Sequence, residues 1–304
     1  MNNSLQVNKT SKPKFSVALQ SEGYKNLINN TLQDPKRATN FIANISTAVA
    51  NNPALQECDS ATILTAGLVA ESLQLSMNAA LGQFHLVPFN DTKNNRKVAT
   101  PVIGYKGYLQ LAMRSGNYKK INVVAIKEGE LIKYDPLDEE IEVNIVDNGE
   151  REHKKTIGYY AMFEYLNGFK KTMYWSKEKM VEHAKKYSQG YKKDLEKGWS
   201  YTFWTKDFDS MAKKTMIRQL ISQWGIMSVD MQKAYFNDMG VIDTKGNVEY
   251  VDNVDFEQVN VAEAPQEVEE TNNEDIKVDK NTGEVVGEPK VEDTPKPAPK
   301  NIFA

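Results

Sequence analysis

The chain has 304 residues, 40% of them hydrophobic and 26% charged, so it can bury one large core or two ordinary ones. The single cysteine, Cys58, excludes an internal disulfide, and the three histidines show no spacing typical of a structural metal site. The apolar stretches are too short to cross a bilayer, and residues 1–14 carry lysines without a following apolar segment. We therefore expect a soluble protein of a reducing compartment, without a secretory signal.

The formal net charge of −3 is the sum of two unlike regions. Residues 252–304 hold 14 Asp and Glu against 5 Lys, which leaves residues 1–251 with an excess of six positive charges. This asymmetry is typical of a body that faces nucleic acid or a membrane and carries an acidic tail. An enzyme with a solubilising tail would show the same pattern, so charge alone leaves both interpretations open.

Helical periodicity dominates the N-terminal part of the chain. Residues 1–14 are polar and predicted to be disordered, and a helical region over 15–80 follows. The spacing of apolar residues predicts three helices in this region, at 15–31, 35–51 and 60–76. The pair Asp34-Pro35 suits the start of the second helix, because proline is favoured at the first helical position after a capping Asp.

The period then changes to alternation. The stretches QFHLVPF and VATPVIG flank a polar loop and predict a β-hairpin at 83–104, followed by a helix at 105–115. Further strands are predicted at 121–129, 141–146, 156–166 and 169–175. Further helices are predicted at 177–187, 205–223 and 228–238, with a tryptophan-rich loop near 198–204. The predicted fold class is therefore α+β: a central antiparallel hairpin and sheet with helices before and after, in a single core over 81–240, and a disordered acidic tail over 252–304.

The segment between Asp91 and Glu128 contains no Asp or Glu in 36 residues. It holds eight cations: Lys93, Arg96, Lys97, Lys106, Arg114, Lys119, Lys120 and Lys127. A solvated surface normally mixes charges of both signs, because neighbouring opposite charges stabilise it. The unmixed run therefore favours a polyphosphate partner over an ordinary solvated face.

Within this segment, PVIGYKGYLQLAMRSGNYKK (101–120) combines cations, tyrosines and a GxxG turn. On a helix that starts near Tyr105, the side chains of Lys106, Gln110 and Arg114 recur every four residues and form one polar stripe. Tyr105 would lie at the helix start, where unpaired amides favour an anion and where its ring could stack on a base. The GxxG turn resembles the backbone clamp of KH domains, and a simple tight turn is the alternative. Tyr108 is predicted to pack in the core.

A second basic element is WTKDFDSMAKKTMIRQLISQW, residues 204–224. Its apolar side chains predict one buried stripe, and Lys214, Arg218 and Ser222 predict a separate polar stripe. Lys214 and Arg218 repel each other at this spacing unless a counter-charge is present. A DNA phosphate is one candidate counter-charge, and the nearby carboxylates of Asp207 and Asp209 are the alternative.

The sequence offers little for catalysis. It contains no Walker A loop, which excludes ATP hydrolysis of the P-loop kind. The pairs Asp207/Asp209 and Glu139/Glu140 are conceivable metal ligands of a nuclease, although exposure in an acidic loop explains the second pair more simply. We therefore predict a protein that is not an enzyme and requires no cofactor or bound metal, with Mg²⁺ only modulating DNA binding.

Four blocks resemble, in order and context, the RecT family of phage single-strand annealing proteins: LGQFHLVPF (81–89), IGYKGYLQLAMRSGNYKKI (103–121), GYYAMFEYLNG (158–168) and WTKDFDSMAKKTMIRQLI (204–221). The resemblance covers about residues 55–225, and LQLSMNAALGQ departs from the more usual Leu-Asn-Pro form. It implies an ATP-independent recombinase that anneals complementary strands, with limited strand exchange, as an oligomeric ring or filament on DNA. The implied partners are single-stranded DNA, the annealed duplex intermediate, further copies of the chain, a 5′→3′ exonuclease and the host single-strand-binding protein, with no membrane. The implied location is the cytoplasm of a bacterial host, with a phage or prophage as the source.

The candidate DNA contacts are the basic, amide and aromatic side chains of these blocks and of the hairpin loop. They are Gln83, Lys93, Arg96, Lys97, Tyr105, Lys106, Gln110, Arg114, Lys119, Lys120, Trp204, Lys206, Lys213, Lys214 and Arg218. A metal-dependent nuclease and a passive single-strand-binding protein are the alternative functions. The nuclease would cleave DNA, and the passive protein would bind without accelerating the pairing of strands. The acidic tail would compete with DNA, solubilise the assembly or carry partner contacts, and the sequence does not distinguish these roles.

Overall fold

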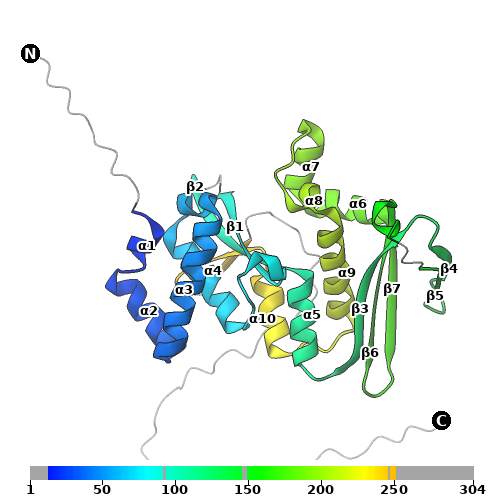
Figure 1. Cartoon of the computed structure of the whole chain (residues 1–304), viewed down its shortest axis with the longest axis horizontal. Helices are drawn as coiled ribbons and strands as arrows, with labels where there is room; N and C mark the ends of the chain where they lie inside the picture. Colours follow the sequence, from blue (N-terminus) through cyan, green and yellow to red (C-terminus); the bar gives the residue numbers. More distant parts are fainter. Residues whose placement is uncertain (1–12, 92–93, 146–148, 246, 251–304) are drawn as a thin grey trace, which may run out of the picture. The chain divides into compact units, whose positions relative to one another are not determined.

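The computed structural model describes residues 13–91, 94–145, 149–245 and 247–250. The predicted disordered segments therefore lie outside the described residues, apart from residues 13 and 14, and so does Lys93 of the hairpin loop. The described part mixes helices with antiparallel sheets, which confirms the predicted α+β class (Figure 1). Within these residues, no helix is long and apolar enough to span a bilayer.

The N-terminal part of the described chain is helical. Its elements are α1 (Phe15–Ala18), α2 (Glu22–Leu32), α3 (Pro35–Asn51), the short 3-10 helix η1 (Pro53–Glu57) and α4 (Ser60–Ser72). The predicted helix over 15–31 is two helices, because the extended backbone of Ser21 ends the first and its hydroxyl caps the second. Helix α3 has its predicted bounds, since the Asp34 carboxylate accepts a hydrogen bond from the Lys36 amide at 2.8 Å.

The predicted hairpin follows η2 (Ala79–Leu81) and consists of β1 (Phe84–Asp91) and β2 (Arg96–Ile103). The two strands pair antiparallel over their whole length. Helix α4 packs against β2, where the Thr62 hydroxyl accepts a hydrogen bond from the Ala99 amide at 2.9 Å (Figure 1). A short strand that was not predicted, β8 (Gly240–Ile242), also packs against β2 and pairs with β9 (Val248–Tyr250).

The second sheet has the strand order β3-β6-β7 and is antiparallel throughout. Its strands are β3 (Tyr118–Lys127), β6 (Thr156–Tyr165) and β7 (Lys170–Ser176), close to three of the predicted segments. The remaining predicted strand, at 141–146, is present as β5 (Glu140–Val143). It pairs with β4 (Leu131–Asp135), which was not predicted, in a separate hairpin. The 3-10 turn η3 (Arg151–His153) precedes β6.

Six helices belong to the second half of the fold in the described residues. They are α5 (Tyr105–Arg114), α6 (Lys177–Tyr187), α7 (Gln189–Lys197), α8 (Phe203–Lys206), α9 (Phe208–Trp224) and α10 (Val229–Asn237). Of this set, α5, α6 and α9 pack on the three-stranded sheet. Helix α9 lies on β6 and also packs against α5, so it links the sheet to the hairpin side of the fold (Figure 1). The predicted helix over 205–223 is broken at Asp207, because the Asp207 carboxylate caps α9 by accepting from the Ser210 amide at 3.1 Å.

Candidate nucleic-acid interface

The two glycines of the GxxG turn allow two backbone segments to approach closely. A Cβ atom on Gly104 would overlap the carbonyl oxygen of Gly82, and one on Gly107 would overlap the carbonyl oxygen of Gln83. The Gly104 amide donates to this Gln83 carbonyl at 2.9 Å, while the Gln83 side chain accepts from the Ser76 amide at 3.0 Å. The turn is therefore a packing feature between the start of α5 and the loop before β1. This geometry supports the tight-turn interpretation rather than the KH-like clamp.

The start of α5 lacks a side-chain cap. Gly104 occupies the N-cap position and has no side chain to accept a hydrogen bond. No residue in the described ranges accepts from the amides of Tyr105 and Lys106. Unpaired amides at a helix N-terminus, together with the helix dipole, favour a negative charge.

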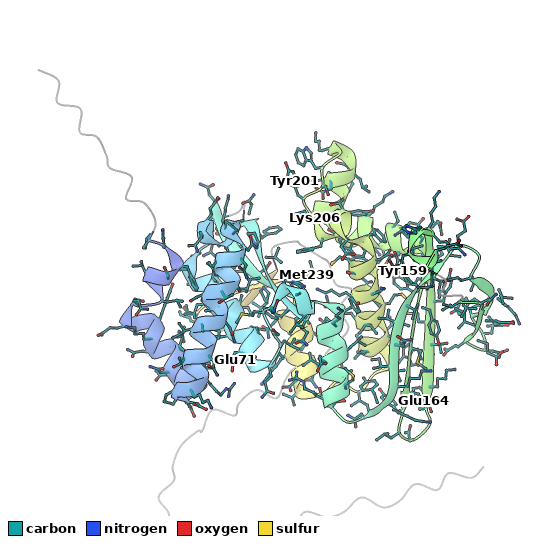
Figure 2. All side chains as sticks on the ribbon, viewed as in Figure 1. Glu71, Tyr159, Glu164, Tyr201, Lys206 and Met239 are labelled. Carbon is teal, nitrogen blue, oxygen red and sulfur yellow. The ribbon has the colours of Figure 1, made fainter. Side chains whose placement is uncertain are left out.

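Three lysines on α5, α8 and α9 belong to the same part of the fold as these amides, because α9 packs against both α5 and α8. Lys106 is exposed on the first turn of α5. Lys206 is exposed at the end of α8, directly before α9, and is labelled in Figure 2. Lys213 extends from α9 towards α5, where its Nζ lies 5.5 Å from the ring centroid of Tyr105. Within the part of the chain that the structure describes, none of the three has a carboxylate partner. We call Tyr105, Lys106, Lys206 and Lys213 the α5–α9 basic site.

The hairpin and α8 also meet beside the α5–α9 basic site. The ring of His85 on β1 lies 6.2 Å from the ring of Phe203 on α8. Burial lowers the pKa of His85, and the charge of Lys214 lowers it further, so the imidazole is neutral near pH 7. His85 therefore contributes contact area to this region but no positive charge.

The fold neutralises most other cations of the acid-free segment. Arg96 pairs with Asp91 at 3.2 Å and with Asp59 at 3.4 Å, and Lys97 pairs with Glu57. Both cations lie at the start of β2, whereas the α5–α9 basic site follows the end of this strand. The predicted hairpin contacts therefore form a separate group, and its third member, Lys93, lies outside the described residues.

A further group lies at the opposite end of α5. Arg114 donates to the Leu73 carbonyl at 2.5 Å and so caps the C-terminus of α4, which is a favourable place for a cation. Lys119 pairs with Glu164 at 2.6 Å, while Lys120 is exposed on the same strand, β3. The predicted stripe on α5 is thus divided by function: Lys106 belongs to the α5–α9 basic site, Gln110 is half-buried, and Arg114 is engaged in the fold.

Lys214 and Arg218 do not form the exposed polar stripe that their spacing predicts. Lys214 is buried and its Nζ lies 2.7 Å from the carboxylate of Asp238, which also pairs with Arg218 at 3.2 Å. The same carboxylate accepts hydrogen bonds from the Tyr108 hydroxyl and the Ile103 amide, both at 2.9 Å. Burial lowers the pKa of Lys214 and raises that of Tyr108. The counter-charge within the fold is therefore Asp238 rather than Asp207 or Asp209.

The aromatic prediction selected a buried tryptophan. Trp204 is 7% exposed and packs against the rings of Tyr191 and Phe208. The exposed aromatic side chains of this region are instead Trp199, Tyr201 and Phe203, which precede it. The tryptophan-rich composition indicated the correct region, but the choice within it required the tertiary packing.

Three of the four carboxylates considered as metal ligands, Asp207, Asp209 and Glu139, are engaged in the fold, and Glu140 is exposed. Asp209 accepts hydrogen bonds from Tyr159 at 2.6 Å and Thr156 at 2.8 Å, and its pKa is low because these bonds outweigh the effect of burial. Glu139 pairs with Lys171 and accepts from Thr172. Across the described segments, no group of three or more His, Cys, Asp or Glu is arranged to hold a metal ion.

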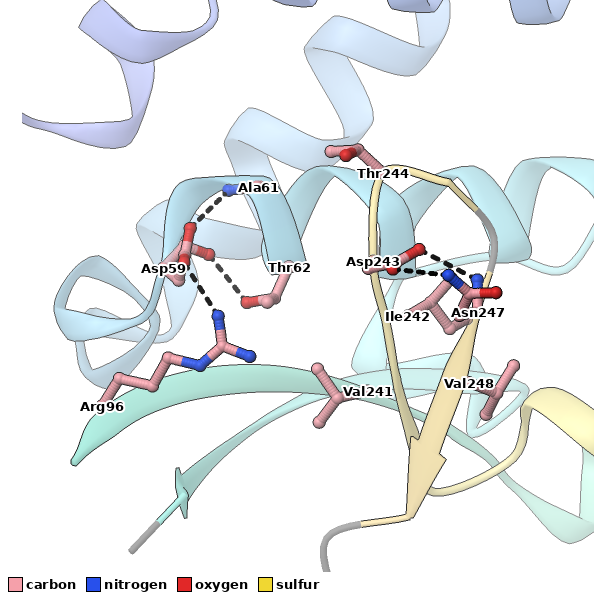
Figure 3. Close-up of a pocket in the computed structure, with 10 residues that line it drawn as sticks. All are labelled: Asp59, Ala61, Thr62, Arg96, Val241, Ile242, Asp243, Thr244, Asn247 and Val248. Carbon is pink, nitrogen blue, oxygen red and sulfur yellow. Dashed lines mark hydrogen bonds and ion pairs between the residues drawn. The ribbon is translucent and has the colours of Figure 1, made fainter. Parts of the chain in front are cut away.

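A cavity of about 290 Å³ lies between the start of α4 and the β8–β9 turn (Figure 3). Asp59 and Arg96 line it as an ion pair, and Asp243 faces it while accepting hydrogen bonds from Asn247. Two carboxylates accompany one guanidinium, so this cavity does not suit a phosphate.

Comparisons with known proteins place the chain in a family. The chain matches the model of the RecT family over residues 39–252, which include all four residues of the α5–α9 basic site. It is 41% identical over 203 residues to the uncharacterized protein YqaK of Bacillus subtilis (strain 168), a match that covers 67% of this chain and 65% of YqaK. It is 28% identical over 204 residues to Protein RecT of Escherichia coli (strain K12), which covers 66% of this chain and 71% of that protein.

Proposed function

The chain belongs to the RecT family, and from this premise we propose that it promotes homologous recombination by annealing complementary single strands of DNA. Family membership supports recombination and single-strand annealing as the class of activity. The observation on this chain that carries the proposal is the α5–α9 basic site. Three lysines on α5, α8 and α9 have no carboxylate partner in the described residues, and the start of α5 has two unpaired amides, which together suit a DNA backbone.

The proposed mechanism needs no reacting side chain. Annealing is slow because the phosphates of two strands repel each other and because each strand folds on itself. The α5–α9 basic site neutralises phosphates, and a strand held along it keeps its bases available for pairing. Sequence information remains in the base pairs, so no side chain has to read base edges.

We extend the proposal to the assembly and its partners. Annealing proceeds without ATP, with limited strand exchange, and the lack of a Walker A loop supports ATP independence. Copies of the chain form a ring or filament on DNA, which raises the local concentration of binding sites along a strand. A 5′→3′ exonuclease supplies the single strand, the host single-strand-binding protein covers it, and Mg²⁺ modulates DNA binding without being required.

The deciding experiment compares two triple variants of the full chain. Lys106→Ala/Lys206→Ala/Lys213→Ala removes the three lysines of the α5–α9 basic site. The matched control, Lys25→Ala/Lys36→Ala/Lys233→Ala, removes three exposed lysines from α2, α3 and α10 with the same change in net charge. Affinity for a labelled oligonucleotide is measured between 50 and 200 mM salt, and annealing is followed by quenching between complementary labelled strands without ATP.

We expect the site variant to bind less tightly, with a salt slope that is smaller by roughly two, because each phosphate contact on a single strand contributes about 0.7. The control should keep the wild-type slope and annealing rate. An unchanged slope in the site variant would remove the α5–α9 basic site from the mechanism. A wild-type chain that binds single strands without accelerating their pairing would favour a passive binding protein, and magnesium-dependent cleavage would favour a nuclease.

A further inference from the structure

Three large aromatic side chains are exposed on the segment that joins α7 to α9. Trp199 is 49%, Tyr201 72% and Phe203 39% exposed. The rings of Trp199 and Tyr201 lie edge to face at 5.4 Å, and Figure 2 shows Tyr201 and Lys206 on this segment. Exposed aromatic clusters of this kind are uncommon on soluble proteins unless they bind something. We call Trp199, Tyr201 and Phe203 the aromatic turn.

The aromatic turn is held in place by one buried carboxylate. An oxygen of Asp194 accepts hydrogen bonds from the amides of Tyr201 and Thr202 at 3.0 and 2.8 Å and from the hydroxyls of Thr202 and Thr205 at 2.9 and 2.8 Å. Gly198 ends α7 in the left-handed conformation with φ 67°, and the Trp199 amide donates to the Asp194 carbonyl at 2.8 Å. The backbone that carries the rings is therefore ordered before any ligand arrives, which lowers the entropic cost of binding.

The charge around the aromatic turn identifies the kind of ligand. Residues 185–206 hold six lysines and only two carboxylates. One of these carboxylates is the buried Asp194, and Glu196 is the other. Lys192, Lys193 and Lys197 are exposed on α7, and Lys206 is exposed on α8. A purely apolar partner would leave these ammonium groups without a counter-charge, whereas a single-stranded nucleic acid offers flat bases for the rings and phosphates for the lysines.

We propose that the aromatic turn is a stacking site for unpaired nucleobases, and this inference rests on the proposed DNA-annealing function. The turn is continuous with the α5–α9 basic site, since Phe203 and Lys206 share α8 and the Phe203 ring contacts that of His85. Bases inside a duplex already stack on one another and are not free for the rings. The aromatic turn therefore gives the protein a preference for unpaired strands that its lysines alone do not supply.

The test separates bases from phosphates. Affinity of the full chain is measured for an ordinary oligonucleotide and for one of the same length made of abasic sites, which keeps the phosphates and lacks the bases. The ratio of the dissociation constant for the abasic strand to that for the ordinary strand reports the contribution of base contacts. Trp199→Ala/Tyr201→Ala should lower this ratio by roughly tenfold or more relative to wild type, given the usual contribution of base stacking.

Trp224→Ala is the matched control, because Trp224 is 51% exposed but ends α9, about 25 Å along that helix from its start. Its ratio should equal that of wild type. Trp199→Phe should keep the ratio within about threefold of the wild-type value. It should also lose part of the quenching of tryptophan fluorescence that we expect DNA binding to cause in wild type. Circular dichroism confirms that each variant is folded.

A double variant that binds DNA with the wild-type ratio overturns the stacking site and leaves the proposed function intact. A wild-type chain that binds the ordinary and abasic strands equally also overturns it. A wild-type chain that binds neither strand overturns the proposed function and, with it, this inference.

Discussion

Replacing Asp238 by Asn tests whether the charged cluster around it serves stability. The Asp238 carboxylate is fully buried and neutralises two cations, Lys214 and Arg218. It also accepts hydrogen bonds from the Tyr108 hydroxyl and the Ile103 amide, so one side chain connects α5, α9, α10 and the end of β2. Asn has the same shape, but it carries no charge and presents an NH₂ group to donors.

The expected loss is large because the two cations remain buried without a counter-charge. Removing one partner of a buried ion pair typically costs about 3–5 kcal/mol of unfolding free energy. Here the cluster already holds two cations for one carboxylate, so Asp238→Asn should cost at least about 3 kcal/mol. For a protein of this size, that corresponds to a melting temperature lower by roughly 6–20 °C.

Urea and thermal unfolding, followed by circular dichroism, measure this loss. Lys97→Ala serves as the comparison, because it breaks an ion pair with Glu57 that solvent screens, so its free energy of unfolding should stay close to that of wild type. Below its lowered melting temperature, Asp238→Asn should bind single-stranded DNA within about twofold of wild type. A cost below about 1 kcal/mol, or a stable variant that has lost DNA binding, would refute the assignment of Lys214 and Arg218 to the fold.

Three further substitutions test individual contacts. Gly107→Ala should destabilise the protein by about 1–3 kcal/mol in urea unfolding, because the new Cβ overlaps a main-chain carbonyl oxygen. The control Gly23→Ala places a Cβ that meets no atom within 4 Å and should be neutral or slightly stabilising. Equal effects of the two substitutions would contradict the close approach at Gly107. Burial acts to raise the pKa of Asp194, but the hydrogen bonds to its carboxylate outweigh burial and hold this pKa below 3.8. The ionised carboxylate therefore stabilises the fold fully above about pH 5, and this stabilisation is lost as the pH falls through the lowered pKa. The unfolding free energies of wild type and Asp194→Asn should therefore converge between pH 5 and pH 2. A difference in unfolding free energy that stays constant over this pH range would argue against stabilisation by the ionised Asp194 carboxylate. Arg114→Ala removes the cap on the Leu73 carbonyl and should cost about 1 kcal/mol while leaving DNA affinity within twofold; a large loss of affinity would restore Arg114 as a contact.

Local signals predicted much of the secondary structure. The start of α3 follows from Asp34 and Pro35, and the hairpin β1–β2 follows from the change of period, because both depend on neighbouring residues alone. Helix α7 was missed because only Tyr191 and Leu195 give it an apolar spacing, and Leu195 is exposed. Its ends are fixed instead by Ser188, which accepts from the Tyr191 amide, and by Gly198 in the left-handed conformation.

The partners of the charged residues could not be predicted in the same way. Lys97 pairs with Glu57 and Lys119 pairs with Glu164, across 40 and 45 residues of sequence. The absence of carboxylates near these lysines in the sequence therefore says little about their neighbours in space. An acid-free segment identifies cations that need a counter-charge, but the fold decides whether the protein itself supplies one.

Lys213 and Lys214 show how this decision separates adjacent residues. Successive residues of an α-helix point about 100° apart, so the two ammonium groups leave α9 in different directions. Lys214 meets the buried carboxylate of Asp238, whereas Lys213 meets the ring of Tyr105 at the open start of α5. A cation that is already neutralised and buried gains little from a phosphate. The proposed contact with DNA is therefore assigned to Lys213, which has no carboxylate partner in the described residues.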